Sequence, residues 1–132
     1  MRKKILSILL LFTAFIVKAQ VTITPSSFNV TDQITITVST AAQSCNLIGT
    51  SPAKVYMHAG VGDDTNAFGF SVIGNWGQDD NVGLMTNNGN GTWSITLTPS
   101  VYFGLNGTQQ ANATKLGMVF RNANGSQTLK LP

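Results

Sequence analysis

The chain is 132 residues long, the size of one small domain. It carries eight Lys and Arg against five acidic residues, a net charge of +3, but Arg2, Lys3, Lys4 and Lys18 all lie among the first 20 residues. The remainder carries four cations and five aspartates, a net charge of −1, which is a poor electrostatic match for nucleic acid. Glu is absent and only 10% of the residues are charged, which disfavours a helix bundle with a surface rich in Glu and Lys.

The first 19 residues have the pattern of a secretory signal peptide. The basic residues 2–4 precede an apolar stretch from Ile5 to Val17, and residues 17–19 offer a cleavage site after Ala19. The apolar stretch has 13 residues, whereas a membrane span needs about 20. We therefore expect residues 20–132 to be a single exported domain, extracellular or periplasmic and free of the membrane after cleavage; an uncleaved anchor is the alternative.

Cys45 is the only cysteine, so a disulfide within the chain is impossible. We interpret it as a small buried apolar residue, and pairing with another chain is the alternative.

Alternation of apolar and polar side chains with a period of two dominates residues 21–131 and predicts strands. In chain order the predicted strands are 21–24, 33–38, 54–58, 69–73, 92–97, 115–121 and 127–131. Turn-forming segments separate them over 60–66, 77–83, 87–91 and 122–126, and the Asn-Gly segment 87–91 predicts a hairpin. These seven strands predict an all-β fold, an antiparallel β-sandwich, and no capped helix is recognised.

The chain offers few residues for catalysis. His58 is the only histidine, and no nucleophile motif occurs, so a catalytic domain is not predicted. Four of the five aspartates come in two adjacent pairs, Asp63-Asp64 and Asp79-Asp80, each within a predicted turn. Such pairs are typical of solvated turns or of a structural Ca²⁺ site, and no other cofactor is predicted.

The two tryptophans have different surroundings. Trp93 alternates with apolar residues in a predicted strand, which indicates core packing. Trp76 lies between glycines and amides in the segment Gly74–Gln78. A flat aromatic ring with polar neighbours suits the apolar face and the hydroxyls of a sugar, so Trp76 is a candidate ligand-binding residue; a loop anchor is the alternative.

Three further residues lie on or at the ends of predicted strands. Tyr56 and His58 share one face of the strand 54–58, which makes that face a candidate ligand surface; a solvated or sheet-covered face is the alternative. Arg121 ends the strand 115–121 and is placed to reach ligand hydroxyls; a plain surface charge is the alternative.

Four segments together resemble a known group of proteins: Lys54–Gly60, Ile73–Thr86, Gly91–Ile95 and Leu116–Gly125. They resemble the Ig-like modules of Bacteroidetes secreted proteins, some of which precede α-amylase-type catalytic domains. More distantly, they are similar to starch-binding carbohydrate-binding modules and to starch-utilisation outer-membrane binding proteins. The resemblance implies an Ig-like β-sandwich from a secreted bacterial protein, with an α-glucan as ligand and neighbouring domains of a longer parent protein as further partners.

The resemblance also implies roles for particular residues. Trp76 matches a platform ring, with Tyr56 or His58 as the second element, and Asp79 and Asp80 either bond hydroxyls or brace the loop. The sequence thus predicts a non-catalytic module that binds a polysaccharide or oligosaccharide and neither nucleic acid nor membrane. The predicted ligand-binding residues are Trp76, Tyr56, His58, Asp79, Asp80 and Arg121. A structural spacer or adhesion domain without a sugar ligand, and a protein-interaction module using a sheet edge, are the alternatives.

Overall fold

The computed structural model describes residues 21–40 and 52–129, where the chain forms eight strands and two short helices. The predicted signal peptide, Cys45 and residues 130–132 lie outside the described residues. The elements are β1 (Val21–Thr24), β2 (Ile34–Ser39), β3 (Tyr56–Gly62), β4 (Ser71–Ile73), β5 (Thr86–Gly89), β6 (Thr92–Leu97), α1 (Pro99–Tyr102), α2 (Gly107–Asn112), β7 (Lys115–Arg121) and β8 (Thr128–Leu129).

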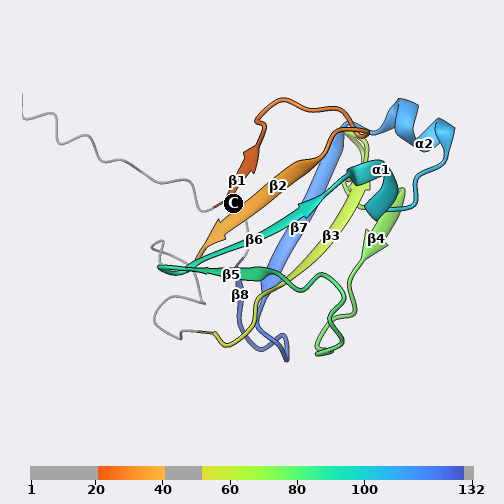
Figure 1. The fold of residues 1–132 in the computed structure, drawn as a ribbon. Helices are drawn as coiled ribbons and strands as arrows, with labels where there is room; N and C mark the ends of the chain where they lie inside the picture. The colour runs from red at the N-terminus through yellow and green to blue at the C-terminus, as the bar shows by residue number, and fades with distance from the viewer. Residues whose placement is uncertain (1–20, 41–51, 130–132) are drawn as a thin grey trace, which may run out of the picture.

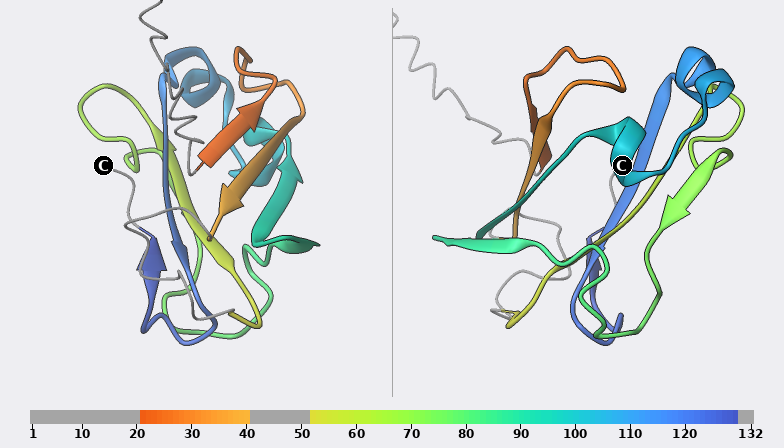
Figure 2. Two further views of the ribbon diagram at one scale, coloured as in Figure 1. Left: turned by 90° about the vertical axis from the view of Figure 1, so that its left-hand side faces the viewer. Right: turned by 45° about the vertical axis from the view of Figure 1, so that its right-hand side comes forward.

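The strands form two four-stranded sheets that face each other as two layers (Figures 1 and 2). The strand order is β1-β2-β6-β5 in one sheet and β4-β3-β7-β8 in the other. All paired strands run antiparallel. The predicted all-β antiparallel sandwich is confirmed.

The core lies between the two sheets and is built mainly from alternate residues of β2, β3, β6 and β7. From β2 it takes Ile34, Ile36 and Val38, each at most 1% exposed. Trp93 of β6 is 5% exposed, which confirms the prediction that this indole packs in the core. Residues on the opposite side of each strand therefore face outward.

The strand β3 is longer than the sequence predicted. We expected a strand over 54–58 and a turn from Gly60, but β3 runs from Tyr56 to Gly62. Gly60 pairs with Gly117 of β7, and the ring of Phe68 lies over both. A Cβ at Gly60 would stand 2.4 Å from Phe68 Cδ1, and one at Gly117 would stand 2.5 Å from Cε2. These two glycines leave room for a ring on the outer face.

The described residues contain eight strands where seven were predicted, because β5 falls in a segment interpreted as a turn. β5 and β6 form the predicted hairpin, with Asn90 at a positive φ of 53° between them. The expectation of no capped helix was also wrong. Asn106 and Gln109 form a capping box at the start of α2: the Asn106 side chain accepts from the Gln109 amide at 2.9 Å, and the Gln109 side chain accepts from the Asn106 amide at 3.0 Å.

Two connections meet at the end of the sandwich opposite α2 (Figures 1 and 2). One is the β4–β5 connection, which carries Trp76, and the other is the β7–β8 turn. Neither α1 nor α2, the helices in the described part of the chain, is long and apolar enough to cross a membrane.

Candidate functional site

Trp76 is a half-exposed aromatic ring on a well-held loop. Trp76 is 48% exposed. It lies in a turn that is closed by a 3.1 Å hydrogen bond from the Gln78 amide to the Asn75 carbonyl. The imidazole of His58 lies 5.7 Å from the indole, centroid to centroid, at an interplanar angle of 78°. Gly125 of the β7–β8 turn packs against the same ring: a Cβ there would stand 2.9 Å from Trp76 Nε1. The ring is thus open to solvent but bounded by residues of β3 and of the β7–β8 turn.

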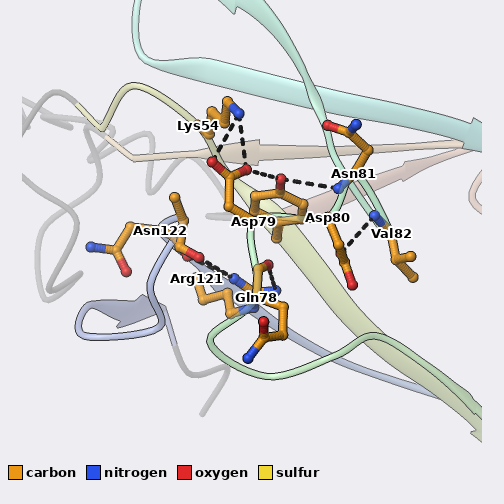
Figure 3. A network of polar contacts seen from close by, with 10 residues as sticks. Lys54, Gln78, Asp79, Asp80, Asn81, Val82, Arg121 and Asn122 are labelled. Atoms are coloured by element: carbon orange, nitrogen blue, oxygen red, sulfur yellow. Dashed lines mark hydrogen bonds and ion pairs between the residues drawn. The ribbon is translucent and has the colours of Figure 1, made fainter.

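Arg121 lies beneath this loop and is only 1% exposed. Its Nη2 donates to the carbonyls of Asn75 at 2.8 Å and Gln78 at 2.9 Å. Its Nη1 donates to the carbonyl of Asn122 at 3.0 Å (Figure 3) and to that of Ala123 at 2.9 Å. Arg121 was predicted either to contact ligand hydroxyls or to be a plain surface charge. Both predictions are wrong, because the side chain is buried and its Nη groups bind the two connections that frame Trp76.

Tyr56 is buried as well. It is 0% exposed, and the Arg121 guanidinium carbon lies 4.5 Å above its ring centroid, within cation–π range. The expectation that Tyr56 lines a ligand surface is therefore corrected: although it shares the outer face of β3 with His58, the β4–β5 connection covers it. Its hydroxyl donates to Asp79 and accepts from the Asn81 amide at 3.2 Å.

Asp79 accepts hydrogen bonds from two side chains: that of Lys54, which precedes β3, and that of Tyr56, the first residue of β3. Besides the Tyr56 hydroxyl, it accepts from Lys54 Nζ at 2.9 and 3.0 Å through its two carboxylate oxygens (Figure 3). The hydrogen bond from Tyr56, followed by that from Lys54, lowers the pKa of Asp79 below its usual 3.8. The same contacts raise the pKa values of Lys54 and Tyr56 above 10.5 and 10.0. Asp79 braces the loop as an anion, one of the two roles considered for it.

Asp80 also braces the loop. Its carboxylate accepts from Asn75 Nδ2 at 2.7 Å and from the Val82 amide at 3.0 Å. The Asn75 bond is the main cause of a pKa lowered below 3.8. In the other pair, Asp63 accepts from the hydroxyl and amide of Thr65 at 2.6 and 2.9 Å, and its pKa is lowered mainly by that hydroxyl. Asp63 and Asp80 each accept the bond from the backbone amide two residues on that defines an Asx turn.

His58 is, besides the buried Arg121, the predicted residue that the structure brings to the Trp76 ring. Its Nδ1 is buried and has no hydrogen-bond partner among the described residues. The backbone of Gly74 lies against that atom, since a Cβ at Gly74 would stand 2.3 Å from it. Across the sheet His58 pairs with Val119, so these two side chains share the outer face beside Trp76.

The structure also has a cleft that none of the six predicted residues lines. It measures about 420 Å³ and lies beside α2, at the other end of the sandwich. Its walls include Phe28, Val30, Val61, Pro99, Gln110 and Lys115. Within residues 21–40 and 52–129, no three His, Cys, Asp or Glu side chains gather as a group that could hold a metal ion.

Sequence reasoning missed two supports of the Trp76 loop. The first is the burial of Arg121, which no local pattern reveals because the strand 115–121 ends in a sequence typical of an exposed turn. The second is the contact between Gly125 and the indole. The glycine at 125 was visible as a turn residue, but its neighbour across the fold was not.

One family model, described as a domain of unknown function (DUF8578), matches residues 21–129. The chain therefore belongs to the DUF8578 family. Among curated proteins, none matches the chain.

Proposed function

We propose that this domain is a non-catalytic carbohydrate-binding module of a secreted bacterial protein, and that it binds a polysaccharide or oligosaccharide through Trp76. The single observation that carries the proposal is a tryptophan 48% exposed on a braced loop between amide-bearing residues. An exposed indole costs solvation free energy, and a loop held by hydrogen bonds to the buried Arg121 side chain keeps it from folding back onto the core.

The surroundings of the indole suit a sugar. Indole faces pack on the C–H groups of pyranose rings, and neighbouring amides exchange hydrogen bonds with hydroxyls. Gln78 and Asn124 are exposed on the two connections that frame Trp76. The charge of −1 for residues 20–132 favours a neutral ligand over a strongly charged one.

An α-glucan such as starch is the ligand we propose, in keeping with the resemblance described above. The arrangement of rings supports a soluble or curved chain: His58 stands at 78° to the indole, so the two rings do not form a flat platform. A flat crystalline polysaccharide would require several coplanar exposed rings, and Trp76 is the one aromatic residue among the large exposed hydrophobic residues of the described chain.

We propose no catalytic role for the carboxylates near Trp76. A glycosidase needs one carboxylic acid with a raised pKa to protonate the leaving oxygen. The pKa values of Asp79 and Asp80 are both lowered by hydrogen bonds, so both are ionised at neutral pH.

A structural spacer or adhesion domain is the second candidate function. It is favoured by the burial of Tyr56 and Arg121, because two of the six predicted ligand residues are committed to internal contacts. In that case Trp76 would serve as a loop anchor or as a contact to a neighbouring domain of a longer parent protein.

Affinity electrophoresis separates the two. Residues 20–132 would be run through native gels containing soluble starch, a soluble cellulose derivative or xylan, beside a plain gel. We expect retardation in the starch gel, its loss in Trp76→Ala, and its retention in Val101→Ala, which removes another exposed apolar side chain (78% exposed) from α1. Equal mobility of the folded wild type in all gels would reject glycan binding and leave the spacer function.

A further inference from the structure

We infer that Arg121 is a positioning residue for Trp76: a buried cation that sets the conformation of the indole-bearing loop before any ligand arrives. This inference rests on the proposed function for its ligand, but its structural part stands on contacts of the described residues alone.

The Nη donors of Arg121 are divided between two segments far apart in the chain, while its Nε is buried without a hydrogen-bond partner among the described residues. Nη2 spans the Trp76 turn by binding the carbonyls of Asn75 and Gln78, and Nη1 binds two carbonyls of the β7–β8 turn. Four bonds of 2.8–3.0 Å to backbone carbonyls fix the orientation of four peptide groups. The guanidinium of Arg121 therefore joins the two turns through its hydrogen bonds.

Burial makes this link costly to release. Arg121 is 1% exposed, and within the described residues no carboxylate lies within ion-pair distance of it, although its charge adds to the hydrogen bonds in lowering the pKa values of Asp79 and Asp80 in the same loop. A buried guanidinium without an ion pair requires the carbonyl dipoles that surround it, because an unsolvated charge is strongly unfavourable. If the Trp76 turn opened, two of the four carbonyls would be lost to the charge. The Trp76 turn is thus held closed because its carbonyls stabilise the buried charge of Arg121.

The guanidinium of Arg121 also lies near two aromatic rings, those of Tyr56 and Trp76. The guanidinium carbon lies 4.5 Å from the Tyr56 ring centroid and 5.9 Å from that of Trp76, both within cation–π range. Tyr56 in turn is bonded to Asp79 in the same loop. Arg121 therefore lies within cation–π range of both rings and is hydrogen-bonded to the turn that carries Trp76, while its own side chain is closed to solvent.

Lysine cannot reproduce these contacts. The three donors of an ammonium share one nitrogen, whereas the four bonds of Arg121 come from two nitrogens, Nη1 and Nη2, of a planar guanidinium. Arg121→Lys keeps the charge and most of the volume but cannot bind both turns at once. We expect Trp76 to become mobile and glycan affinity to fall about tenfold, because the ligand must then order the loop.

The test compares Arg121→Lys with Lys115→Gln, which changes a cation on the same face of the same strand but away from the loop. The Lys115 ammonium forms an ion pair with Asp64, at 3.7 Å. Affinity for maltoheptaose is measured by calorimetry, and the mobility of Trp76 by acrylamide quenching of tryptophan fluorescence. Trp93 is 5% exposed, so quenching reports on Trp76. Arg121→Lys should show weaker binding and stronger quenching, and Lys115→Gln should match the wild type in both.

Wild-type quenching and affinity in a folded Arg121→Lys would overturn the inference. If the wild type does not bind maltoheptaose or starch but Arg121→Lys still increases quenching, the positioning role stands and the proposed ligand fails. If Arg121→Lys does not fold, NMR of the wild type decides: the Arg121 Nη groups should give separate, slowly rotating signals, and a single averaged signal would overturn the inference.

Discussion

Gly125→Ala tests whether the β7–β8 turn positions the indole of Trp76. Gly125 has a φ of +74°, and a Cβ added there would lie 2.9 Å from Trp76 Nε1 and 3.3 Å from Cε2. The first distance is shorter than a normal contact, so the indole must move away. The substitution therefore has two separate effects, a backbone strain and a displacement of the ring.

The chain offers controls for the strain alone. Gly104 and Gly89 have φ values of +62° and +82°, and a Cβ at either would meet nothing within 4 Å. An alanine held at positive φ costs about 1–2 kcal/mol, so all three variants should lose about that much of the free energy of unfolding. Only Gly125→Ala should also lose glycan affinity. If the displaced ring forfeits a stacking contact of about 0.5–1.5 kcal/mol, the loss is about two- to tenfold.

Urea denaturation gives the stability of each variant, and calorimetry with maltoheptaose gives its affinity. The reasoning predicts similar unfolding midpoints for the three variants and weaker binding for Gly125→Ala alone. Binding by Gly125→Ala equal to that of Gly104→Ala and Gly89→Ala would refute it, since the ring would then have no need of its position against Gly125.

Three further predictions concern the supports of the fold. Gly117→Ala places a Cβ 2.5 Å from Phe68 Cε2 and should destabilise the domain by about 1–3 kcal/mol in urea, whereas the same substitution should cost little when it is made in a Phe68→Ala variant. An equal cost in the two backgrounds would show that the ring is not the cause. Asn106→Ala removes the capping box of α2 and should cost about 1 kcal/mol, visible as faster amide exchange of α2, while maltoheptaose affinity stays unchanged because the helix lies at the opposite end. Altered affinity would contradict that separation. Finally, the lowered pKa of Asp79 means that the folded state holds its carboxylate more strongly in the ionised form than the unfolded chain, whose value is near 3.8. This contribution to stability is present above pH 3.8 and is lost as the pH falls further, through the folded pKa. Below about pH 4, the melting temperature of the wild type should fall more steeply with decreasing pH than that of Asp79→Asn. Identical pH dependence of the two melting temperatures would contradict this prediction.

The sandwich was predictable because its strands carry their own signal. In β2 and β6 the side chains alternate strictly, since one face is buried and the other is solvated, and the structure has these strands within one residue of the predicted bounds. β3 was predicted too short because Gly60 is a turn former by local preference. Its actual role depends on Phe68, which approaches only after the chain has folded back.

The candidate site was predictable only in part, for a similar reason. The glycines and amides around Trp76 mark a loop with an exposed ring, and the half-exposed indole fits that expectation. The burial of Tyr56 and Arg121 depends on the β4–β5 connection lying across the outer face of β3 and β7, a long-range arrangement that alternation within a strand does not encode. In sequence, Arg121 is simply the last residue of a strand; in the fold, four carbonyls surround it.

The measurement that tests the proposed function most directly is acrylamide quenching of tryptophan fluorescence with and without saturating maltoheptaose. Only Trp76 is substantially exposed, at 48% against 5% for Trp93, so the quenchable signal belongs to it. A glycan seated on the indole should reduce the quenching constant in a saturable manner, with no such change in Trp76→Phe. A quenching constant that stays the same at every maltoheptaose and soluble-starch concentration would contradict glycan binding at Trp76.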